Sequence, residues 1–177
     1  MGDWRDLLVD DDAGLRAILS EAKTLAVIGA KASPAEPAHY VPAYLVERGY
    51  RAVPVNPTLP PGAVVFGEPV AATVADLPAP VDVIEIFRRP EHLPGHAEEI
   101  LDLPWRPKAV WFQLGIRNDR AAERLARAGI RVVQDRCMMP EYRRLFDVGV
   151  SDRRSRHAKG ATPPSDSPGP TPPTGLE

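Results

Sequence analysis

Four apolar runs in this sequence each end in residues that can contact a small ligand. A glycine ends the first run, cationic side chains end the second and fourth, and an amide and a glycine end the third. The residues at these ends are Gly29, Phe87, Arg88, Arg89, Gln113, Gly115, Asp135, Arg136 and Cys137. Apolar runs without alternation are typical of buried parallel strands, whose carboxyl ends meet at one edge of a sheet where ligands bind. The pattern therefore predicts a nucleotide-type binding domain.

Alternating strand and helix patterns indicate the elements that must position these residues. Buried strands are expected over residues 25–28, 51–55, 81–87, 109–112 and 131–134, with a brief strand at 64–66. Helices are expected over residues 12–22, 40–48, 94–103, 119–128 and 140–146, with a helical turn at 74–77. Asp11 or Asp12 can cap the first helix and Asn118 the fourth. This order predicts an α/β, Rossmann-like parallel sheet of five or six strands with helices on both faces.

The length, net charge and cysteine content of the chain limit the classes of protein to which it can belong. The chain has 177 residues, which suits one domain with tails, and a net charge of -2, which does not favour nucleic acid as a partner. A single cysteine excludes an internal disulfide and fits a reducing cytoplasm. No apolar run reaches the roughly 18 residues that span a bilayer, so we expect no membrane contact. We predict a cytoplasmic protein with one domain over residues 1–149 and a disordered, proline-rich tail over residues 150–177. Its basic segment at 152–159 is expected to be solvated, and a nucleic-acid or membrane contact there is the alternative.

The usual nucleotide-binding motifs do not account for this edge of the sheet. The dinucleotide fingerprint Gly-x-Gly-x-x-Gly keeps only Gly29, because Lys31 and Pro34 occupy its second and third positions. Asn56 and Pro57 stand where an acidic residue would bind the ribose of NAD. The sequence also contains neither a P-loop nor a Gly-x-Ser-x-Gly elbow. A standard NAD site is therefore disfavoured.

Residues 15–146 resemble a known family, the small stand-alone CoA-binding proteins, whose fold is that of the CoA-binding domain in the succinyl-CoA synthetase α subunit. The similarity is distributed over short pieces whose order and spacing agree. These pieces are Ala-Val-Ile-Gly-Ala at 26–30, His-Tyr-Val at 39–41 with Tyr44 and Leu45, Gly-Tyr at 49–50, Val-Pro-Val-Asn-Pro at 53–57, Val-Asp-Val at 81–83, Phe-Arg-Arg-Pro at 87–90, Val-Trp-Phe-Gln-Leu-Gly at 110–115 and Asp-Arg-Cys at 135–137.

The resemblance implies a small-molecule ligand, CoA or an acyl-CoA, at the carboxyl edge of the sheet. The expected cofactor-binding residues are Gly29, Ala30, Lys31, Ser33, His39, Asn56, Pro57, Phe87, Arg88, Arg89, Gln113, Gly115 and Arg136. Gly29 would allow close backbone approach, and the helix after it would present its positive end to phosphate. Lys31 and the arginines would bind phosphate, although consecutive Arg88 and Arg89 diverge, so at most one is expected to face the crevice. Phe87 would flank the adenine or the pantetheine arm.

The chain departs from the family pattern at four positions. Family members often carry serine, arginine and serine where Lys31, Glu36 and Ala38 stand, and a lysine where Thr58 stands. The exchanges remove a hydroxyl and two cations, restore one cation, and add an acid. The expected function is a small non-catalytic CoA-binding protein with no known protein partner. The alternatives are a component or remnant of an acyl-CoA ligase, thiol-based CoA chemistry, or an interaction protein that has lost CoA binding.

Several other side chains have both a chemical and a structural interpretation. Cys137 is a candidate nucleophile, and a mixed disulfide with CoA is one hypothesis, although buried cysteine is common. His92 and His96 have the spacing of metal ligands, but Pro94 and Gly95 lie between them, and no metal site is expected. An ion pair between Asp135 and Arg136 would hold the shape of the site. The apolar stripe at helical spacing is expected to pack in the core; its members are Tyr40, Val41, Tyr44 and Leu45.

Overall fold

A computed structural model describes residues 2–147 of the chain. Its centre is a parallel sheet of five strands in the order β2-β1-β5-β6-β7. The strands are β1 (Thr24–Ile28), β2 (Arg51–Val55), β5 (Val83–Ile86), β6 (Ala109–Phe112) and β7 (Arg131–Val133). The α/β class, the parallel sheet and its Rossmann-like order are confirmed. The predicted tail and its basic segment lie outside the described residues.

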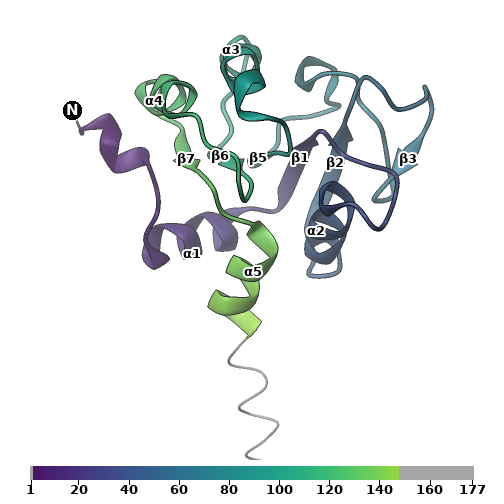
Figure 1. Cartoon of the computed structure of the whole chain (residues 1–177), viewed down its shortest axis with the longest axis horizontal. Helices are drawn as coiled ribbons and strands as arrows, with labels where there is room; N and C mark the ends of the chain where they lie inside the picture. The colour runs from purple at the N-terminus through teal and green to yellow at the C-terminus, as the bar shows by residue number, and fades with distance from the viewer. Residues whose placement is uncertain (1, 148–177) are drawn as a thin grey trace, which may run out of the picture.

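The strands occur where apolar runs predict them because both faces of the sheet are covered. Figure 1 shows α3 (Leu93–Leu101) and α4 (Asp119–Arg127) on one side of the sheet, with α1 (Asp12–Glu21), α2 (Pro37–Val46) and α5 (Met138–Tyr142) on the other. Two apolar cores correspond to these sides. Ile84, Ile86 and Phe112 pack towards α3 and α4, whereas Val27, Val83 and Trp111 pack towards α1, α2 and α5. Each strand alternates between the two cores, which explains why its sequence shows no polar face.

The helix ends follow the predicted capping rules at two places. The Asp11 carboxylate accepts a hydrogen bond of 2.7 Å from the Gly14 N–H, and Asn118 Oδ1 accepts one of 2.9 Å from Ala121. Helix α2 instead begins at Pro37, three residues before its predicted start, because proline is well tolerated in the first turn of a helix. Helix α5 likewise starts before Pro140, at Met138, and continues as a π-helical segment, Arg143–Asp147.

The brief strand predicted near residue 64 belongs to a separate hairpin. Strand β3 (Val64–Val65) pairs antiparallel with β4 (Glu68–Pro69), so the main sheet has five strands and not six. Short 3-10 segments complete the fold: η1 (Trp4–Leu7), η2 (Val74–Asp76) and η3 (Pro90–His92). The N-terminal segment covers the outer edge of β7, where Val9 N–H donates a hydrogen bond of 2.8 Å to the Val132 carbonyl.

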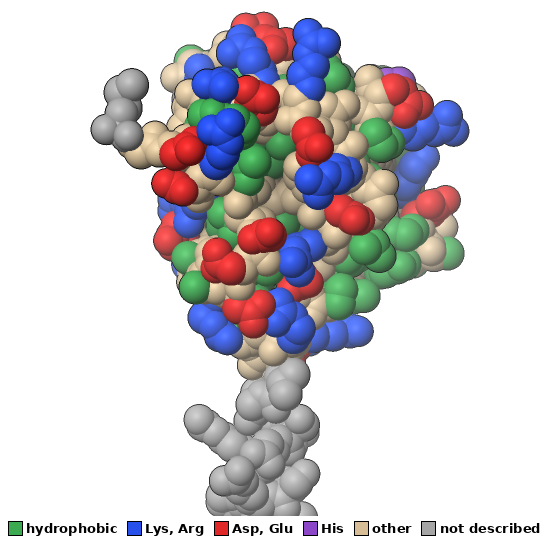
Figure 2. Space-filling view, turned by 60° about the vertical axis from the view of Figure 1, so that its left-hand side comes forward, with side chains coloured by type: hydrophobic (Ala, Val, Ile, Leu, Met, Phe, Trp, Pro, Cys, Tyr) green, Lys and Arg blue, Asp and Glu red, His purple; other side chains and the backbone are tan. Residues whose placement is uncertain are grey.

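Charged side chains of both signs are mixed on the surface. On the face shown in Figure 2, basic and acidic groups are interspersed and do not gather into one patch of a single sign. Ion pairs between elements agree with this picture, as between Arg124 and Glu98 at 2.9 Å and between Arg131 and Glu21 at 2.6 Å. None of the helices described over residues 2–147 has the length and apolar character that crossing a membrane requires.

Candidate functional site

A cleft of about 530 Å³ lies at the carboxyl edge of the sheet. It is formed by the loops that follow four neighbouring strands and by the first turns of α2. The lining residues are Gly29 and Lys31 after β1; Glu36, Pro37, Ala38, Tyr40 and Val41 from α2; Phe87, Arg88, Arg89 and Pro90 after β5; Gln113, Leu114, Gly115 and Ile116 after β6; and Cys137 after β7. The chain reverses its direction across the sheet between β1 and β5, which is where open α/β sheets form crevices.

Position 29 requires a glycine because the protein's own backbone leaves no room for a side chain there. Its φ of +84° is in the left-handed region, and a Cβ at this position would lie 2.5 Å from the Phe87 carbonyl oxygen. Its N–H donates a hydrogen bond of 2.9 Å to the Val55 carbonyl. The glycine therefore lets β1, β2 and the loop after β5 meet at one point, and it forms part of the cleft floor.

Arg88 occupies the junction between the cleft and a smaller hollow of about 90 Å³ that is also lined by Gly29, Asn56 and Pro57. The side chain is half-buried, and its Nε atom is buried without a hydrogen-bond partner among residues 2–147. A buried guanidinium N–H without an acceptor is costly, on the order of 1–3 kcal/mol. An anionic ligand would supply the missing acceptor.

The two consecutive arginines both line the cleft, so the prediction that at most one would face it is wrong. Arg88 is half-buried and Arg89 is exposed. The backbone explains the difference from a regular strand: β5 ends at Ile86, and Arg89 already occupies the position before the 3-10 segment η3. Phe87 is half-buried between them and the apolar core.

Two of the predicted site residues, Asn56 and His39, make contacts that hold the loop after β1 in place. Asn56 is buried, donates a hydrogen bond of 2.9 Å from Nδ2 to the Ala30 carbonyl, and accepts two from Thr58 through Oδ1. His39 Nδ1 lies 2.8 Å from the Lys31 carbonyl oxygen, and its ring packs against Phe66 at 5.2 Å between centroids. These contacts fix the loop that presents Lys31.

Several predicted ligand residues therefore lie near the cleft without lining it. Ala30 is fully buried, Ser33 is exposed on the loop, and His39 lines a separate surface hollow. Asn56 and Pro57 line only the small hollow beside Arg88. The structure brings together seven of the predicted residues in the cleft itself: Gly29, Lys31, Phe87, Arg88, Arg89, Gln113 and Gly115.

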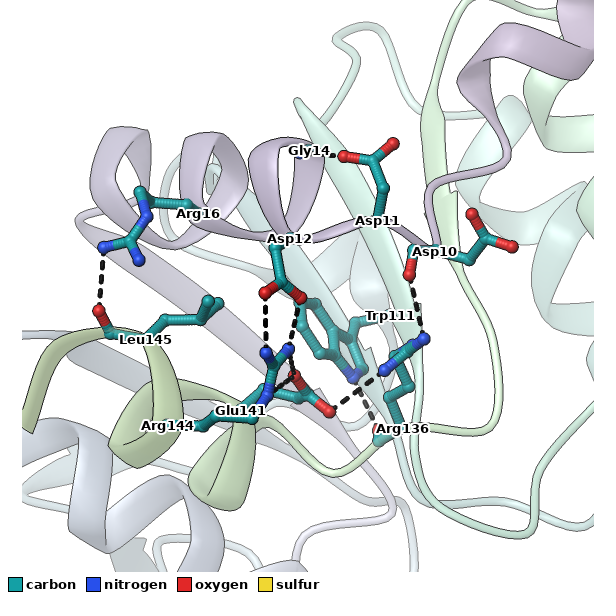
Figure 3. A network of polar contacts seen from close by, with 10 residues as sticks. All are labelled: Asp10, Asp11, Asp12, Gly14, Arg16, Trp111, Arg136, Glu141, Arg144 and Leu145. Carbon is teal, nitrogen blue, oxygen red and sulfur yellow. Dashed lines mark hydrogen bonds and ion pairs between the residues drawn. The ribbon is translucent and has the colours of Figure 1, made fainter. Parts of the chain in front are cut away.

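The Arg136 side chain makes its hydrogen bonds with residues outside the cleft (Figure 3). Its guanidinium donates to Glu141 at 3.1 Å and to the Asp10 carbonyl at 2.8 Å, and its own carbonyl accepts a hydrogen bond of 2.7 Å from Trp111 Nε1. The expected ion pair with Asp135 does not form, because the Asp135 carboxylate instead accepts the Gly115 N–H at 2.6 Å. Both residues hold the loops of the site in place.

The same network ties α5 to α1. Arg144 lies between Asp12, at 2.7 Å, and Glu141, at 2.5 Å, and Arg16 donates to the Leu145 carbonyl (Figure 3). Glu141 thus accepts hydrogen bonds from both Arg136 and Arg144. The segment that carries Cys137 is therefore joined to the N-terminal part of the chain by one ion pair, Arg144–Asp12, and by the hydrogen bonds of Arg16 and Arg136.

A buried acid lies beneath the cleft and was not predicted. Glu85 is fully buried on β5; one carboxyl oxygen accepts a hydrogen bond from Gln113 Nε2, and the other has no partner among residues 2–147. Burial raises the pKa of Glu85 to about 8. The sequence signal was available, because Glu85 is the single charged residue in an otherwise apolar strand.

Cys137 is half-buried in the cleft wall at the position preceding α5. Burial raises the pKa of its thiol, and a hydrogen bond from the Met139 backbone acts in the opposite direction. Gln113 Oε1 accepts the Met138 N–H at 3.4 Å, so the amide of Gln113 links Glu85 to the start of α5. This places Glu85, Gln113 and Cys137 in one cluster.

Two apolar side chains at the rim were not expected as site residues. Tyr40 is 42% exposed and lines the cleft, so its assignment to the core was wrong, whereas Val41, Tyr44 and Leu45 are buried as predicted. Leu114 is 71% exposed at the opposite loop. Tyr40 lies in the first turns of α2, which form one wall of the cleft.

The histidine pair does not form a metal site. His92 precedes α3, and His96 Nδ1 lies 2.8 Å from Glu99. Across the described part of the chain, no group of three or more His, Cys, Asp or Glu side chains is arranged to hold a metal ion.

Comparison with known proteins agrees with this geometry. The chain is 32% identical over 126 residues to an uncharacterized protein of Bacillus subtilis, YneT, covering 71% of this chain and 90% of that protein. A solved Thermus thermophilus protein, cell-free ID.343, is 51% identical with a TM-score of 0.73 and covers 77% of this chain and 100% of its own. A hypothetical protein from Pyrococcus horikoshii is 34% identical with a TM-score of 0.71, covering 77% of this chain and 93% of that one. Residues 23–143 match the family described as CoA binding domain, and the chain therefore belongs to the CoA-binding domain family.

Proposed function

We propose that this protein binds CoA or an acyl-CoA in the cleft and holds the ligand without converting it. The observation that carries the proposal is Arg88, whose buried Nε lacks an acceptor at the junction of the two cavities. A phosphate oxygen is the acceptor that a guanidinium binds best. Family membership selects CoA among the phosphate-bearing ligands.

The charges and apolar groups of the cleft fit the two ends of such a ligand. Lys31, Arg88 and Arg89 line one side, and the N-terminus of α2 adds a positive dipole end there. Tyr40, Val41 and Ile116 form an apolar lining that suits the pantetheine arm. We place the phosphates at the cationic side and the arm along the apolar side.

Holding the ligand is favoured over converting it. The Asn56 amide and the Asp135 carboxylate are already used in hydrogen bonds within the protein, and the Gln113 amide joins Glu85 to Met138. The cations that line the cleft suit the binding of phosphate. Such a protein would act in the cytoplasm, where its single thiol stays reduced.

A second candidate function is protein interaction after loss of CoA binding. Glu36 supports it, because this acid lines the cleft close to where the phosphates are placed. The exposed Leu114 and Tyr40 side chains would then form part of a protein contact.

Calorimetry with CoA, acetyl-CoA, dephospho-CoA, NAD and ATP tests the proposal. We expect CoA and acetyl-CoA to bind, and NAD and ATP to bind far more weakly. Absence of CoA binding at millimolar ligand, which corresponds to a binding free energy weaker than about -4 kcal/mol, would remove this function and favour the interaction protein.

A further inference from the structure

The side-chain amide of Gln113 lies in the cleft wall in a fixed orientation. Gln113 is 3% exposed and lines the cleft directly after β6. Its Oε1 accepts the Met138 N–H at 3.4 Å, and its Nε2 donates to the Glu85 carboxyl group at 2.5 Å. A backbone N–H can only donate, so the contact with Met138 identifies the oxygen end of the amide and turns the nitrogen towards Glu85.

One hydrogen of this amide has no acceptor in the protein. The Gln113 nitrogen carries two hydrogens, and the bond to Glu85 is the single hydrogen bond that it donates within residues 2–147. A buried N–H without an acceptor is costly, and native proteins contain few of them. Because Gln113 lines the cleft, a ligand bound there can supply the acceptor.

The surroundings of Gln113 select a neutral acceptor. Buried Glu85 lies behind the amide, and a negatively charged group in front of it would be unfavourable so close to this acid. The cleft residues that follow in the chain carry no charge; they are Leu114, Gly115 and Ile116. A carbonyl oxygen such as that of an amide therefore fits this position.

The position of Gln113 relative to Arg88 indicates which part of the ligand carries that carbonyl. The Gln113 backbone N–H donates to the Ile86 carbonyl at 3.3 Å, so the residue lies one strand spacing, roughly 4.8 Å, from the end of β5. Arg88 follows this same strand end by two residues and lines the cleft. In CoA the pantetheine arm, which contains two amide groups, is attached directly to the pyrophosphate. A ligand with its phosphates at Arg88 therefore brings an amide carbonyl close to Gln113.

We propose that Gln113 is a specificity-determining residue whose free Nε2 hydrogen donates to an amide carbonyl of the pantetheine arm, and that Glu85 is the positioning residue that holds this nitrogen in place. The inference rests on the proposed function, because it requires a CoA-type ligand with its phosphates near Arg88. Phosphate contacts alone would hold any adenine nucleotide with a similar set of phosphates. The contact with Gln113 adds affinity for the arm only, so it distinguishes CoA from such nucleotides.

Calorimetry with CoA and with ADP 3′-phosphate, which keeps every phosphate of CoA but lacks the pantetheine arm, tests the role of Gln113. Gln113→Met removes the donor at similar side-chain length and should weaken CoA binding by roughly tenfold, while the affinity for ADP 3′-phosphate should change by less than about threefold. Gln134→Met is the matched control, because Gln134 follows β7 and does not line the cleft. This control should leave both affinities unchanged.

Two substitutions of Glu85 test the positioning role. Glu85→Gln keeps a carbonyl acceptor for the Gln113 nitrogen and should retain the CoA affinity to within about threefold. Glu85→Met removes the acceptor and should weaken CoA binding about as much as Gln113→Met does, again without a change for ADP 3′-phosphate. Equal CoA affinities of the two Glu85 variants would overturn the positioning role.

The same titrations separate failure of this inference from failure of the proposed function. If Gln113→Met binds CoA as the unaltered protein does, or loses affinity equally for both ligands, the role of Gln113 is overturned and CoA binding stands. If the unaltered protein binds no CoA at millimolar concentration, the proposed function is overturned and this inference with it.

NMR of the unaltered protein decides the matter should Gln113→Met fail to fold. One of the two Gln113 Nε2 hydrogen signals should shift on addition of CoA and stay in place on addition of ADP 3′-phosphate, since only CoA offers the carbonyl. Equal shifts with both ligands, or no shift with CoA, would overturn the inference.

Discussion

Gln113 donates a hydrogen bond to the carboxyl group of Glu85, one strand away and fully buried. The pair joins β5 to the loop after β6, directly beneath the cleft. The acid has no cationic partner in the described residues, so burial dominates and raises its pKa, while the hydrogen bond from Gln113 acts in the opposite direction.

The first prediction concerns the pH dependence of stability. The pKa of Glu85 rises from 4.5 to about 8 on folding, so the folded state binds more protons between these values. The free energy of unfolding should therefore fall by several kcal/mol as pH rises from about 4.5 to 8. In Glu85→Gln this decline should be absent, as urea unfolding at several pH values will show. Glu91→Gln, at an exposed position, is the control and should keep the decline; a parallel decline in Glu85→Gln would contradict the assignment.

The second prediction separates two glycines with similar backbone angles. Gly29→Ala brings a Cβ to 2.5 Å from the Phe87 carbonyl at a φ of +84°, and should lower the free energy of unfolding by more than about 3 kcal/mol. Gly49→Ala has a φ of +94° but open space around the new Cβ, and should cost about 1 kcal/mol. Urea unfolding of the two variants measures the difference. Equal costs would show that the close approach at Gly29 is relieved elsewhere.

The third prediction concerns Arg88 and ligand affinity. Arg88→Gln removes a charge-assisted contact to phosphate and should weaken CoA binding by roughly 10- to 100-fold. Its stability should not fall, because the Arg88 Nε has no protein partner to lose among residues 2–147. Calorimetry and thermal unfolding measure the two quantities together. A stable variant with unchanged CoA affinity would place the phosphates elsewhere.

The fourth prediction concerns Arg136, for which the sequence predicts a phosphate contact. Arg136→Gln removes hydrogen bonds to Glu141 and the Asp10 carbonyl, and should lower the free energy of unfolding by about 1–3 kcal/mol. The CoA affinity should change by less than a factor of about 3, since the guanidinium does not line the cleft. A loss of affinity as large as that of Arg88→Gln would restore the phosphate role.

The sequence allows the sheet and the place of the cleft to be predicted because both depend on local signals. The apolar runs at Thr24–Ile28 and Ala109–Phe112 are long enough to identify strands, and parallel strands bring their carboxyl ends together by geometry. The direction of the Arg136 side chain was not predictable in this way. It depends on Asp10, which lies 126 positions away in the sequence.

Two further differences have equally specific causes. The sequence predicts Tyr40 in the core because it extends the apolar stripe of Val41, Tyr44 and Leu45, whereas in the structure it is exposed and lines the cleft. A single acid such as Glu85 does not disturb the apolar pattern of a strand. Its hydrogen-bond partner, Gln113, follows a different strand, so the pair cannot be read from local sequence.

The contact between the His39 ring and Phe66 joins the small β3–β4 hairpin to α2, one of the elements that form the cleft. His39 also contacts the carbonyl of Lys31, so displacement of the hairpin would be transmitted to the position of that ammonium group. The conformation of the hairpin and the placement of Lys31 in the cleft are therefore coupled through the imidazole of His39.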